Sequence, residues 1–252
     1  MSKFFVKSNQ IEGNLIRIEG TDVNHIKNVL RQKEGDEIVI CDSEKQKNYF
    51  CDIDKIEKDF IICKISKELE DFKSNIKITI MQGLPKREKM DLVVQKSVEL
   101  GSFCIQPVDM ERCIVKYNEK DKIKKVERWQ KISEVAAKQC DRDFIPKVNE
   151  IKTLKSICKM MGEYDIVILA YEKEEKTMLK ETLTKIKKDY NYKENEIKIA
   201  VIIGPEGGLS EKEVEMIQEN NNVITVSLGK RILRTETVAL NVLSIIMYEL
   251  EG

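Results

Sequence analysis

Three runs of apolar residues, in which polar and apolar side chains do not alternate, constrain the fold of this chain most strongly. They cover Ile166–Ala170, Ile199–Ile203 and Val223–Ser227. A strand with one face in water alternates between the two kinds of side chain, so uninterrupted runs of this length are typical of strands buried on both faces. Strands of that kind form a parallel sheet that helices cover, and we therefore expect an α/β domain.

Further strand and helix patterns precede these runs. Residues 76–80 alternate like a strand, and residues 90–98 then repeat apolar side chains at helical spacing up to Gly101, a typical stop signal. Residues 103–107 predict another strand, and residues 123–136 predict another helix. The domain should therefore begin near residue 73.

The last helical segment, Val238–Leu250, is apolar nearly all round. A helix that buries only one stripe carries polar residues on its opposite face, and this segment lacks such a face. We expect a helix that is buried on most sides. A second copy of the chain should cover part of it in a homodimer, because an open apolar face would promote aggregation.

The first seventy residues follow a different pattern. Five short segments rich in β-branched and aromatic residues predict strands at residues 4–7, 15–18, 37–41, 49–53 and 60–65. One helical segment, from a candidate N-cap at Thr21 to Arg31, interrupts them. The pattern predicts a small β-barrel followed by a polar linker, Lys67–Asn75. We therefore expect two domains, residues 1–72 and residues 73–252.

Composition narrows the classes of function. No apolar stretch reaches 18 residues and the N-terminus lacks a signal-peptide core, so we expect a cytoplasmic protein without a membrane span. The seven cysteines form no Cys-x-x-Cys pair, which disfavours disulfides and zinc sites. Residues 73–150 carry 17 lysines and arginines against 12 acidic residues, or +5, in a chain of zero net charge. This basic region indicates an anionic partner, although solvated lysine-rich helix faces explain it equally well.

A glycine-rich loop, Gly204–Gly208, directly follows one of the apolar runs and leads to Ser210 and Glu213, which have the spacing of a helix capping box. Glycines let backbone approach a ligand closely, but a tight strand-to-helix turn explains them too. The loop lacks the Gly-Lys-Ser/Thr of a P-loop and the Gly-x-Gly-x-x-Gly of a dinucleotide site. An ATPase or a nucleotide-dependent oxidoreductase is therefore disfavoured.

A second loop, residues 228–237, places Lys230, Arg231 and Arg234 just before the last helix. Cations near a helix N-terminus oppose the helix dipole, so a bound phosphate or RNA strand is expected to favour them. The alternative is an ordinary surface turn.

The sequence Gly-Pro-Glu-Gly-Gly at 204–208, combined with Leu-Gly-x-Arg-Ile-Leu-Arg-x-Glu-Thr at 228–237, closely resembles the ribosomal RNA small subunit methyltransferase E family of the SPOUT superfamily. Residues 95–101, 111–112 and 128–146 extend the resemblance. Cys113 stands where serine is usual and Val238 where alanine is usual.

The resemblance implies a PUA-like β-barrel that binds RNA, followed by a SPOUT-type, trefoil-knotted methyltransferase domain. It also implies a homodimer that uses S-adenosylmethionine and no metal. The implied reaction is methylation at N3 of a uridine in 16S rRNA of the small ribosomal subunit (uridine 1498 in the usual RNA numbering). A methyltransferase acting on another rRNA or tRNA nucleotide, or a non-catalytic RNA-binding assembly factor, are the alternatives. The intact glycine loops argue against the latter.

The cofactor is expected in a cage built mainly of loop backbone. Gly204 and Gly229 should leave room for it, and Leu228, Ile232 and Leu233 should pack against the adenine unless they are ordinary core residues. The complete expected set is Leu169, Ala170, Ile203, Gly204, Pro205, Glu206, Gly207, Gly208, Leu228, Gly229, Ile232 and Leu233.

Methylation at N3 requires that the N3 proton leaves the uracil. Arg234 is the candidate for stabilising the developing negative charge or for holding a phosphate of the target. Glu206 and Glu236 are the acidic catalytic candidates, although each fits a loop cap or an ion pair equally well. Contacts to the RNA backbone are expected from Arg31, Lys86, Lys89, Lys96, Arg112, Arg142 and Arg231.

Overall fold

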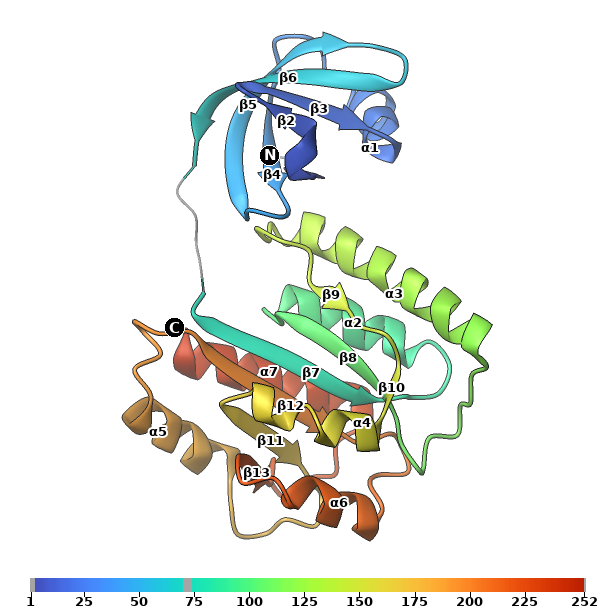
Figure 1. Ribbon diagram of the computed structural model, residues 1–252, viewed down its shortest axis with the longest axis vertical. Helices are drawn as coiled ribbons and strands as arrows, with labels where there is room; N and C mark the ends of the chain where they lie inside the picture. The colour runs from blue at the N-terminus through green and yellow to red at the C-terminus, as the bar shows by residue number, and fades with distance from the viewer. Residues whose placement is uncertain (1–2, 70–73, 252) are drawn as a thin grey trace. The chain divides into compact units, whose positions relative to one another are not determined.

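The computed structural model describes residues 3–69 and 74–251, which form two compact units. The first unit combines the described residues up to 69 with residues 137–145. The second contains residues 74–136 and 146–251. The domain boundary predicted between residues 72 and 73 lies outside the described residues. Figure 1 labels the helices and strands of both units.

The first unit is built on a six-stranded sheet with the order β1-β4-β5-β6-β3-β2. The β1 strand runs parallel to β4, and the other neighbours are antiparallel. Along β3, Ile16 and Ile18 are buried and their neighbours are exposed, so one face of the sheet covers an apolar core. The strands are β1 (Lys3–Val6), β2 (Ile11–Glu12), β3 (Leu15–Glu19), β4 (Glu37–Asp42), β5 (Lys47–Ile56) and β6 (Phe60–Glu68).

One helical segment interrupts these strands, as predicted. It begins as α1 (Thr21–Asn24) and continues as a π-helical turn, η2 (His25–Val29). Thr21 is the first helical residue and not the N-cap, so that detail of the prediction is wrong. Gly20 occupies the N-cap with a φ of 74°, a conformation that glycine adopts without a steric penalty.

Residues 137–145 belong to the first unit because polar contacts tie them to it. The Lys3 ammonium lies 2.9 Å from Asp143 Oδ1, and Asn48 Nδ2 donates to the same carboxylate at 2.7 Å. Lys138 Nζ lies 2.8 Å from Asp22 Oδ1. The predicted division into residues 1–72 and 73–252 did not assign residues 137–145 to the first unit.

The second unit contains a seven-stranded sheet with the order β10-β8-β7-β12-β11-β13 and with β9 beside β8. Its neighbouring strands pair in parallel. Residues 199–203 are all buried, which confirms the predicted parallel sheet. Residues 223–225 are only partly buried because β13 lies at the sheet edge. The strands are β7 (Ile76–Gly83), β8 (Cys104–Asp109), β9 (Lys147–Val148), β10 (Lys152–Thr153), β11 (Ile166–Ala170), β12 (Ile197–Ile203) and β13 (Val223–Val226).

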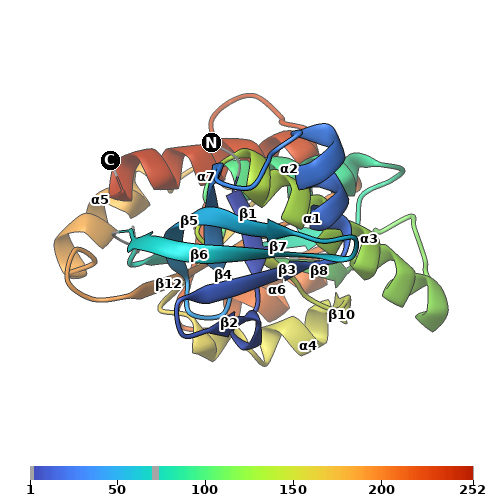
Figure 2. The same ribbon diagram turned by 90° about the horizontal axis from the view of Figure 1, so that it is seen from above.

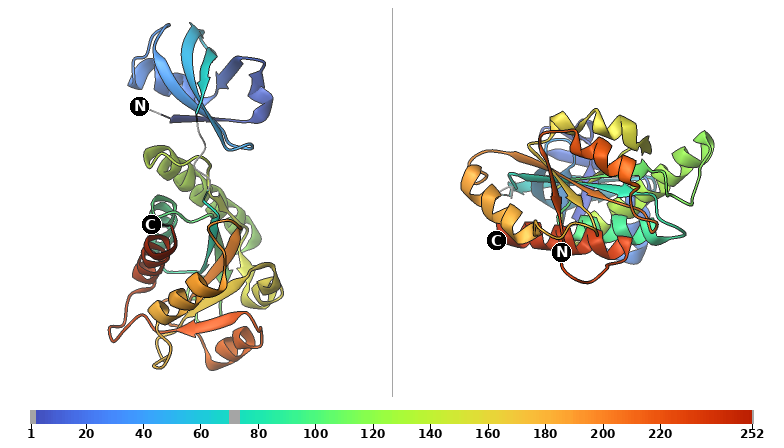
Figure 3. Two further views of the ribbon diagram at one scale, coloured as in Figure 1. Left: turned by 90° about the vertical axis from the view of Figure 1, so that its left-hand side faces the viewer. Right: turned by 90° about the horizontal axis from the view of Figure 1, so that it is seen from below.

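Helices cover both faces of this sheet. Figures 2 and 3 show α2, α5 and α7 on one face and α4 and α6 on the other. Ser210 accepts the backbone N–H of Glu213, so α6 begins with the predicted cap. The helices are α2 (Lys89–Glu99), α3 (Glu119–Gln139), α4 (Leu154–Cys158), η3 (Met161–Glu163, a 3₁₀ turn), α5 (Leu179–Asp189), α6 (Glu211–Gln218) and α7 (Thr235–Leu250); a further 3₁₀ turn, η1 (Ser8–Gln10), lies in the first unit.

The C-terminal helix α7 is buried or partly buried over most of its surface within a single chain. Val242, Leu243 and Ile246 are fully buried, and of residues 238–250 only Ser244 and Tyr248 are exposed, Tyr248 by 80%. The helix packs against α2 and α5 as well as against the sheet, in agreement with the predicted burial on most sides. Ser244 and Tyr248 form its one open face. The trefoil knot implied by the resemblance concerns how the chain is threaded and stays a prediction.

Candidate functional site

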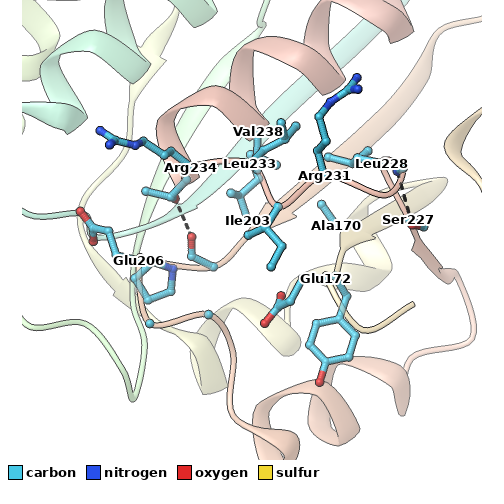
Figure 4. A pocket seen from close by; sticks show the side chains of 18 of the residues that line it. Ala170, Glu172, Ile203, Glu206, Ser227, Leu228, Arg231, Leu233, Arg234 and Val238 are labelled. Atoms are coloured by element: carbon cyan, nitrogen blue, oxygen red, sulfur yellow. Dashed lines mark hydrogen bonds between the residues drawn. The ribbon is translucent and has the colours of Figure 1, made fainter. Parts of the chain in front are cut away.

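The loops that follow three neighbouring strands enclose a cleft of about 560 Å³, a size typical of sites for small organic ligands. Because β11 lies between β12 and β13, the carboxyl ends of these parallel strands bring their loops together at one edge of the sheet. Figure 4 shows most of the side chains that line the cleft. They come from residues 170–172, 203–208 and 227–234, with Thr235 and Val238 of α7 and Lys89 of α2.

All the residues expected in the cofactor cage line this cleft except Leu169. Leu169 is fully buried inside β11, where it pairs with Ile202 and Thr225 of the neighbouring strands. Ile232 lines the cleft and is 89% exposed, so it is not the ordinary core residue that the sequence left open. Leu228 and Leu233 are partly buried.

We had expected Gly204 and Gly229 to leave room for the cofactor, and that stays a prediction. The loops by themselves already favour glycine at both positions. Gly229 has a φ of 108°, and a Cβ built there would meet no atom within 4 Å. A Cβ on Gly204 would lie 3.2 Å from the carbonyl carbon of Gly208, so the loop packs tightly on itself. This packing leaves loop backbone as the wall of the cleft.

The glycine loop is fixed to the start of α7 by a hydrogen bond that sequence reasoning missed. Thr235 Oγ1 donates to the Gly204 carbonyl at 2.6 Å. Behind it, Gln82 at the end of β7 is completely buried. The Gln82 side-chain amide donates to the carbonyl of Gly83 at 2.9 Å.

Three further hydrogen bonds fix the loop and the start of α6 to the segment after β8. Arg112 Nη1 donates to the carbonyl of Gly207 at 3.1 Å. The Ser210 hydroxyl donates to Glu111 Oε2 at 2.7 Å, and the Glu111 backbone N–H donates to Glu213 Oε1 at 2.8 Å. The capping box of α6 therefore also joins two loops of the site.

Glu206 is held as an anion. Its Oε1 accepts the backbone N–H of Lys86 at 3.0 Å and lies 3.0 Å from the Lys89 ammonium. Burial acts to raise the pKa of Glu206, but the backbone N–H groups of Glu206 and Lys86 and the Lys89 ammonium outweigh it and lower the pKa. A carboxylate in this environment is a weak proton acceptor.

Lys89 lies between two acids and not on an open surface. Its ammonium is 3.1 Å from Glu236 Oε2 as well as close to Glu206, and both carboxylates raise the pKa of Lys89. Glu206, Glu236 and Lys89 therefore form one cluster. We had expected Lys89 at the RNA backbone.

Three cations of the second loop extend from the cleft without a hydrogen-bond or ion-pair partner in the described part of the chain: Lys230, Arg231 and Arg234. Arg234 is the N-cap residue of α7, but its side chain does not cap the helix. Figure 4 shows Arg231 and Arg234 directed outwards. Lys86 is exposed next to Glu206.

The other cations expected at RNA do not line the cleft. Lys96 on α2 forms an ion pair with Glu99 at 2.7 Å. Arg31 and Arg142 belong to the first unit, where Arg31 has a φ of 57° and Arg142 stacks 4.6 Å above the Phe144 ring.

Several cleft residues were not predicted as site residues: Tyr171, Glu172, Ser227, Thr235 and Val238. All lie within the predicted loops or next to predicted positions. Extending each loop by two residues along the chain would have found most of them.

Within the described ranges, no helix is both long and apolar enough to cross a bilayer. Residues 3–69 and 74–251 also contain no group of three or more His, Cys, Asp or Glu side chains able to hold a metal ion.

Both units match families of RNA methyltransferases. A family described as "RNA methyltransferase domain" matches residues 72–247, and "RNA methyltransferase PUA domain" matches residues 18–66. Ribosomal RNA small subunit methyltransferase E of Bacillus subtilis is 35% identical over 100% of this chain and 98% of its own. The protein of that name from Aquifex aeolicus is 31% identical over 95% and 97%.

Two solved structures are similar over nearly the whole chain. Ribosomal RNA small subunit methyltransferase E from Neisseria gonorrhoeae, bound to S-adenosyl methionine, has a TM-score of 0.82 at 32% identity and covers 98% of this chain and 97% of its own. A methyltransferase from Legionella pneumophila in complex with the cofactor SAM has a TM-score of 0.81 at 29% identity, with 98% and 96% covered.

Proposed function

Since the chain belongs to the ribosomal RNA small subunit methyltransferase E family of S-adenosylmethionine-dependent enzymes, we propose that it methylates N3 of a uridine in 16S rRNA, at position 1498 in the usual RNA numbering. The observation that carries this proposal is the cleft at the carboxyl ends of β11, β12 and β13. Its walls combine loop backbone with apolar side chains, and unpartnered cations surround its mouth. A small cofactor and an RNA strand need these two environments side by side.

The residues present fit S-adenosylmethionine. Ile203, Leu228, Leu233 and Val238 offer an apolar surface to an adenine ring, and residues 204–208 offer backbone groups to the polar parts of the cofactor. The bound cofactor supplies an electrophilic methyl group on its sulfonium. Ile232, exposed in the free chain, gains a partner when cofactor or RNA covers it.

Arg234 is the residue that we assign to charge stabilisation during the reaction. Loss of the N3 proton leaves negative charge on the uracil, and an unpartnered guanidinium at the mouth of the cleft is suited to hold that charge. Stabilising the uracil anion makes the N3–H of the neutral base more acidic, so its proton can pass to water without a strong general base. Glu206 and Glu236 then serve mainly to hold Lys89 in place.

Contacts to the RNA backbone are assigned to cations that need not read the base sequence. Arg231, Lys86 and Arg112 are next to the cleft or in its loops. Arg31, Arg142 and Lys96 complete the proposed set. The substrate is rRNA, free or assembled in the small subunit, and we propose that the protein acts in the cytoplasm.

A homodimer is proposed from the open face of α7. Ser244 and Tyr248 are exposed on a helix rich in apolar residues, and the Tyr248 side chain is 80% exposed. A second copy packed on this helix would remove that surface from water.

Mass spectrometry of nucleosides from 16S rRNA of a deletion strain tests the proposed reaction. We expect 3-methyluridine to be lost and to return with the wild-type gene, but not with Arg234→Ala. If 3-methyluridine persists and another nucleoside of rRNA or tRNA disappears, the target is different. If no modification disappears although the chain binds RNA, the protein acts without catalysis.

A further inference from the structure

The cleft contains one carboxylate that no cation of the described residues neutralises. Four of the charged side chains lining the cleft are cationic, and only Glu172 and Glu206 are acidic. Glu206 is engaged by the Lys86 backbone and by Lys89. Glu172 has neither a hydrogen-bond nor an ion-pair partner within residues 3–69 and 74–251.

Glu172 follows the end of β11 by two residues, so the sheet brings it to the same edge as the glycine loop. A Cβ built on Gly208 would lie 2.8 Å from Glu172 Oε1. A side chain at residue 208 would displace the carboxylate from this position against the loop backbone. Figure 4 shows Glu172 turned into the cleft.

S-adenosylmethionine carries two positive groups, the sulfonium and the α-ammonium of its methionine end. Its adenine is expected at the apolar residues Ile203, Leu228 and Leu233, which leaves the methionine end for the polar part of the cleft. An ammonium donates hydrogen bonds to a carboxylate, whereas a sulfonium has no N–H to donate. Because Glu172 is exposed, water screens its charge, and hydrogen bonds contribute more than charge alone.

We infer that Glu172 binds the α-ammonium of the cofactor and makes the cleft selective for adenosine derivatives that carry an amino-acid end. This inference rests on the proposed function, because it needs S-adenosylmethionine in this cleft. It leaves Arg231 and Arg234 to the RNA and Lys230 to the cofactor carboxylate or the RNA, and it reserves the unpaired acid for the cationic end.

Isothermal titration of the full chain with three ligands tests this inference. S-adenosylmethionine has both cations, S-adenosylhomocysteine keeps only the ammonium, and 5′-methylthioadenosine has neither. We expect Glu172→Gln to weaken binding of the first two ligands about two- to fivefold, as for a solvent-exposed charged contact, and to leave methylthioadenosine unchanged. Unchanged methylthioadenosine binding also shows that the variant pocket is folded.

Glu175→Gln is the matched control, because Glu175 is exposed in the same loop but does not line the cleft. It removes the same charge and should leave the affinities for all three ligands unchanged. Equal losses for all three ligands in Glu172→Gln, a loss for S-adenosylmethionine alone, or no loss at all would each overturn the inference. Failure of the wild-type chain to bind S-adenosylmethionine would instead overturn the cofactor site of the proposed function.

Discussion

Gln82 Nε2 donates a hydrogen bond of 2.7 Å to the hydroxyl of Thr235, a residue 153 positions away in the chain. That hydroxyl in turn donates a hydrogen bond of 2.6 Å to the Gly204 carbonyl. The end of β7, the start of α7 and the glycine loop are therefore joined through one side chain. Gln82 is fully buried and Thr235 is 6% exposed, while Gly204 is partly buried.

Thr235→Val should loosen this junction. Valine has a similar shape but lacks the hydroxyl, so the Gln82 amide and the Gly204 carbonyl each lose a partner. A buried polar group without a partner costs about 1–3 kcal/mol. We expect the free energy of unfolding in urea to fall by about that amount and the affinity for S-adenosylmethionine to fall with it. Thr235→Ser keeps the hydroxyl and serves as the control; equal behaviour of the two variants would contradict the role of the hydrogen bonds.

Gly229→Ala should weaken cofactor binding through backbone strain. The φ of 108° at Gly229 is unfavourable for alanine although its methyl group would meet no neighbour. Strain of this kind costs about 1–3 kcal/mol. Calorimetric titration with S-adenosylmethionine measures the loss. Gly162→Ala, at a glycine with equal space and no positive φ, should bind like the wild type; similar losses in both variants would show that strain is not the cause.

Arg234→Ala should separate catalysis from cofactor binding. The Arg234 guanidinium has no partner among the residues described. The sulfonium of the cofactor is also positively charged, so the guanidinium should not attract it. We expect near wild-type affinity for S-adenosylmethionine and a fall of about 100-fold or more in single-turnover methyl transfer at saturating RNA. Arg231→Ala should mainly weaken RNA binding and reduce its salt dependence. If Arg234→Ala loses cofactor affinity in proportion to activity, the residue belongs to the cofactor cage.

The Glu206–Lys89 pair should stabilise the fold over a defined range of pH. The pKa of Glu206 is lowered from its ordinary 4.5, so its contribution is present above pH 4.5 and is lost as the pH falls through the folded-state pKa. The pKa of Lys89 is raised from its ordinary 10.5, so its contribution is present below pH 10.5 and is lost as the pH rises through the higher folded-state pKa.

Urea unfolding across this range measures the effect as the difference between wild type and Glu206→Gln. The difference should be constant at neutral pH and should shrink below pH 4.5. Glu175→Gln, which removes an exposed carboxylate outside the cleft, should show no such step. A difference that does not depend on pH down to the acid limit of folding would contradict the ionised state of Glu206.

We predict from the open face of α7 that the protein is a homodimer in solution. Light scattering at micromolar concentration should give twice the chain mass of 29.3 kDa. Tyr248→Arg should shift the mass towards one chain, because the charge would have to be buried in the dimer contact. Ile123→Arg, at a residue 60% exposed on α3, is the control and should not change the mass. A monomer mass for the wild type would refute the dimer.

Local signals in the sequence were sufficient for the framework of the second unit and for the motifs of its site. The run at residues 199–203 predicted a strand buried on both faces, and it lies inside a parallel sheet. Ser210 and Glu213 predicted the start of α6, where each side chain bonds to the backbone of the other. The evidence for such features lies within a few residues, so periodicity and spacing contain it.

Tertiary structure decided the roles of individual side chains. Lys89 was expected at RNA but is engaged by Glu206 and Glu236, which are more than a hundred residues away in sequence. The contact between Glu172 and the loop at Gly208, and the hydrogen bond between Gln82 and Thr235, have no local signature at all. Composition and periodicity report which face of an element is buried, whereas charge pairing and hydrogen bonding depend on which distant segments the sheet order brings to one edge. That order is set by packing of the whole unit, and only the folded chain contains it.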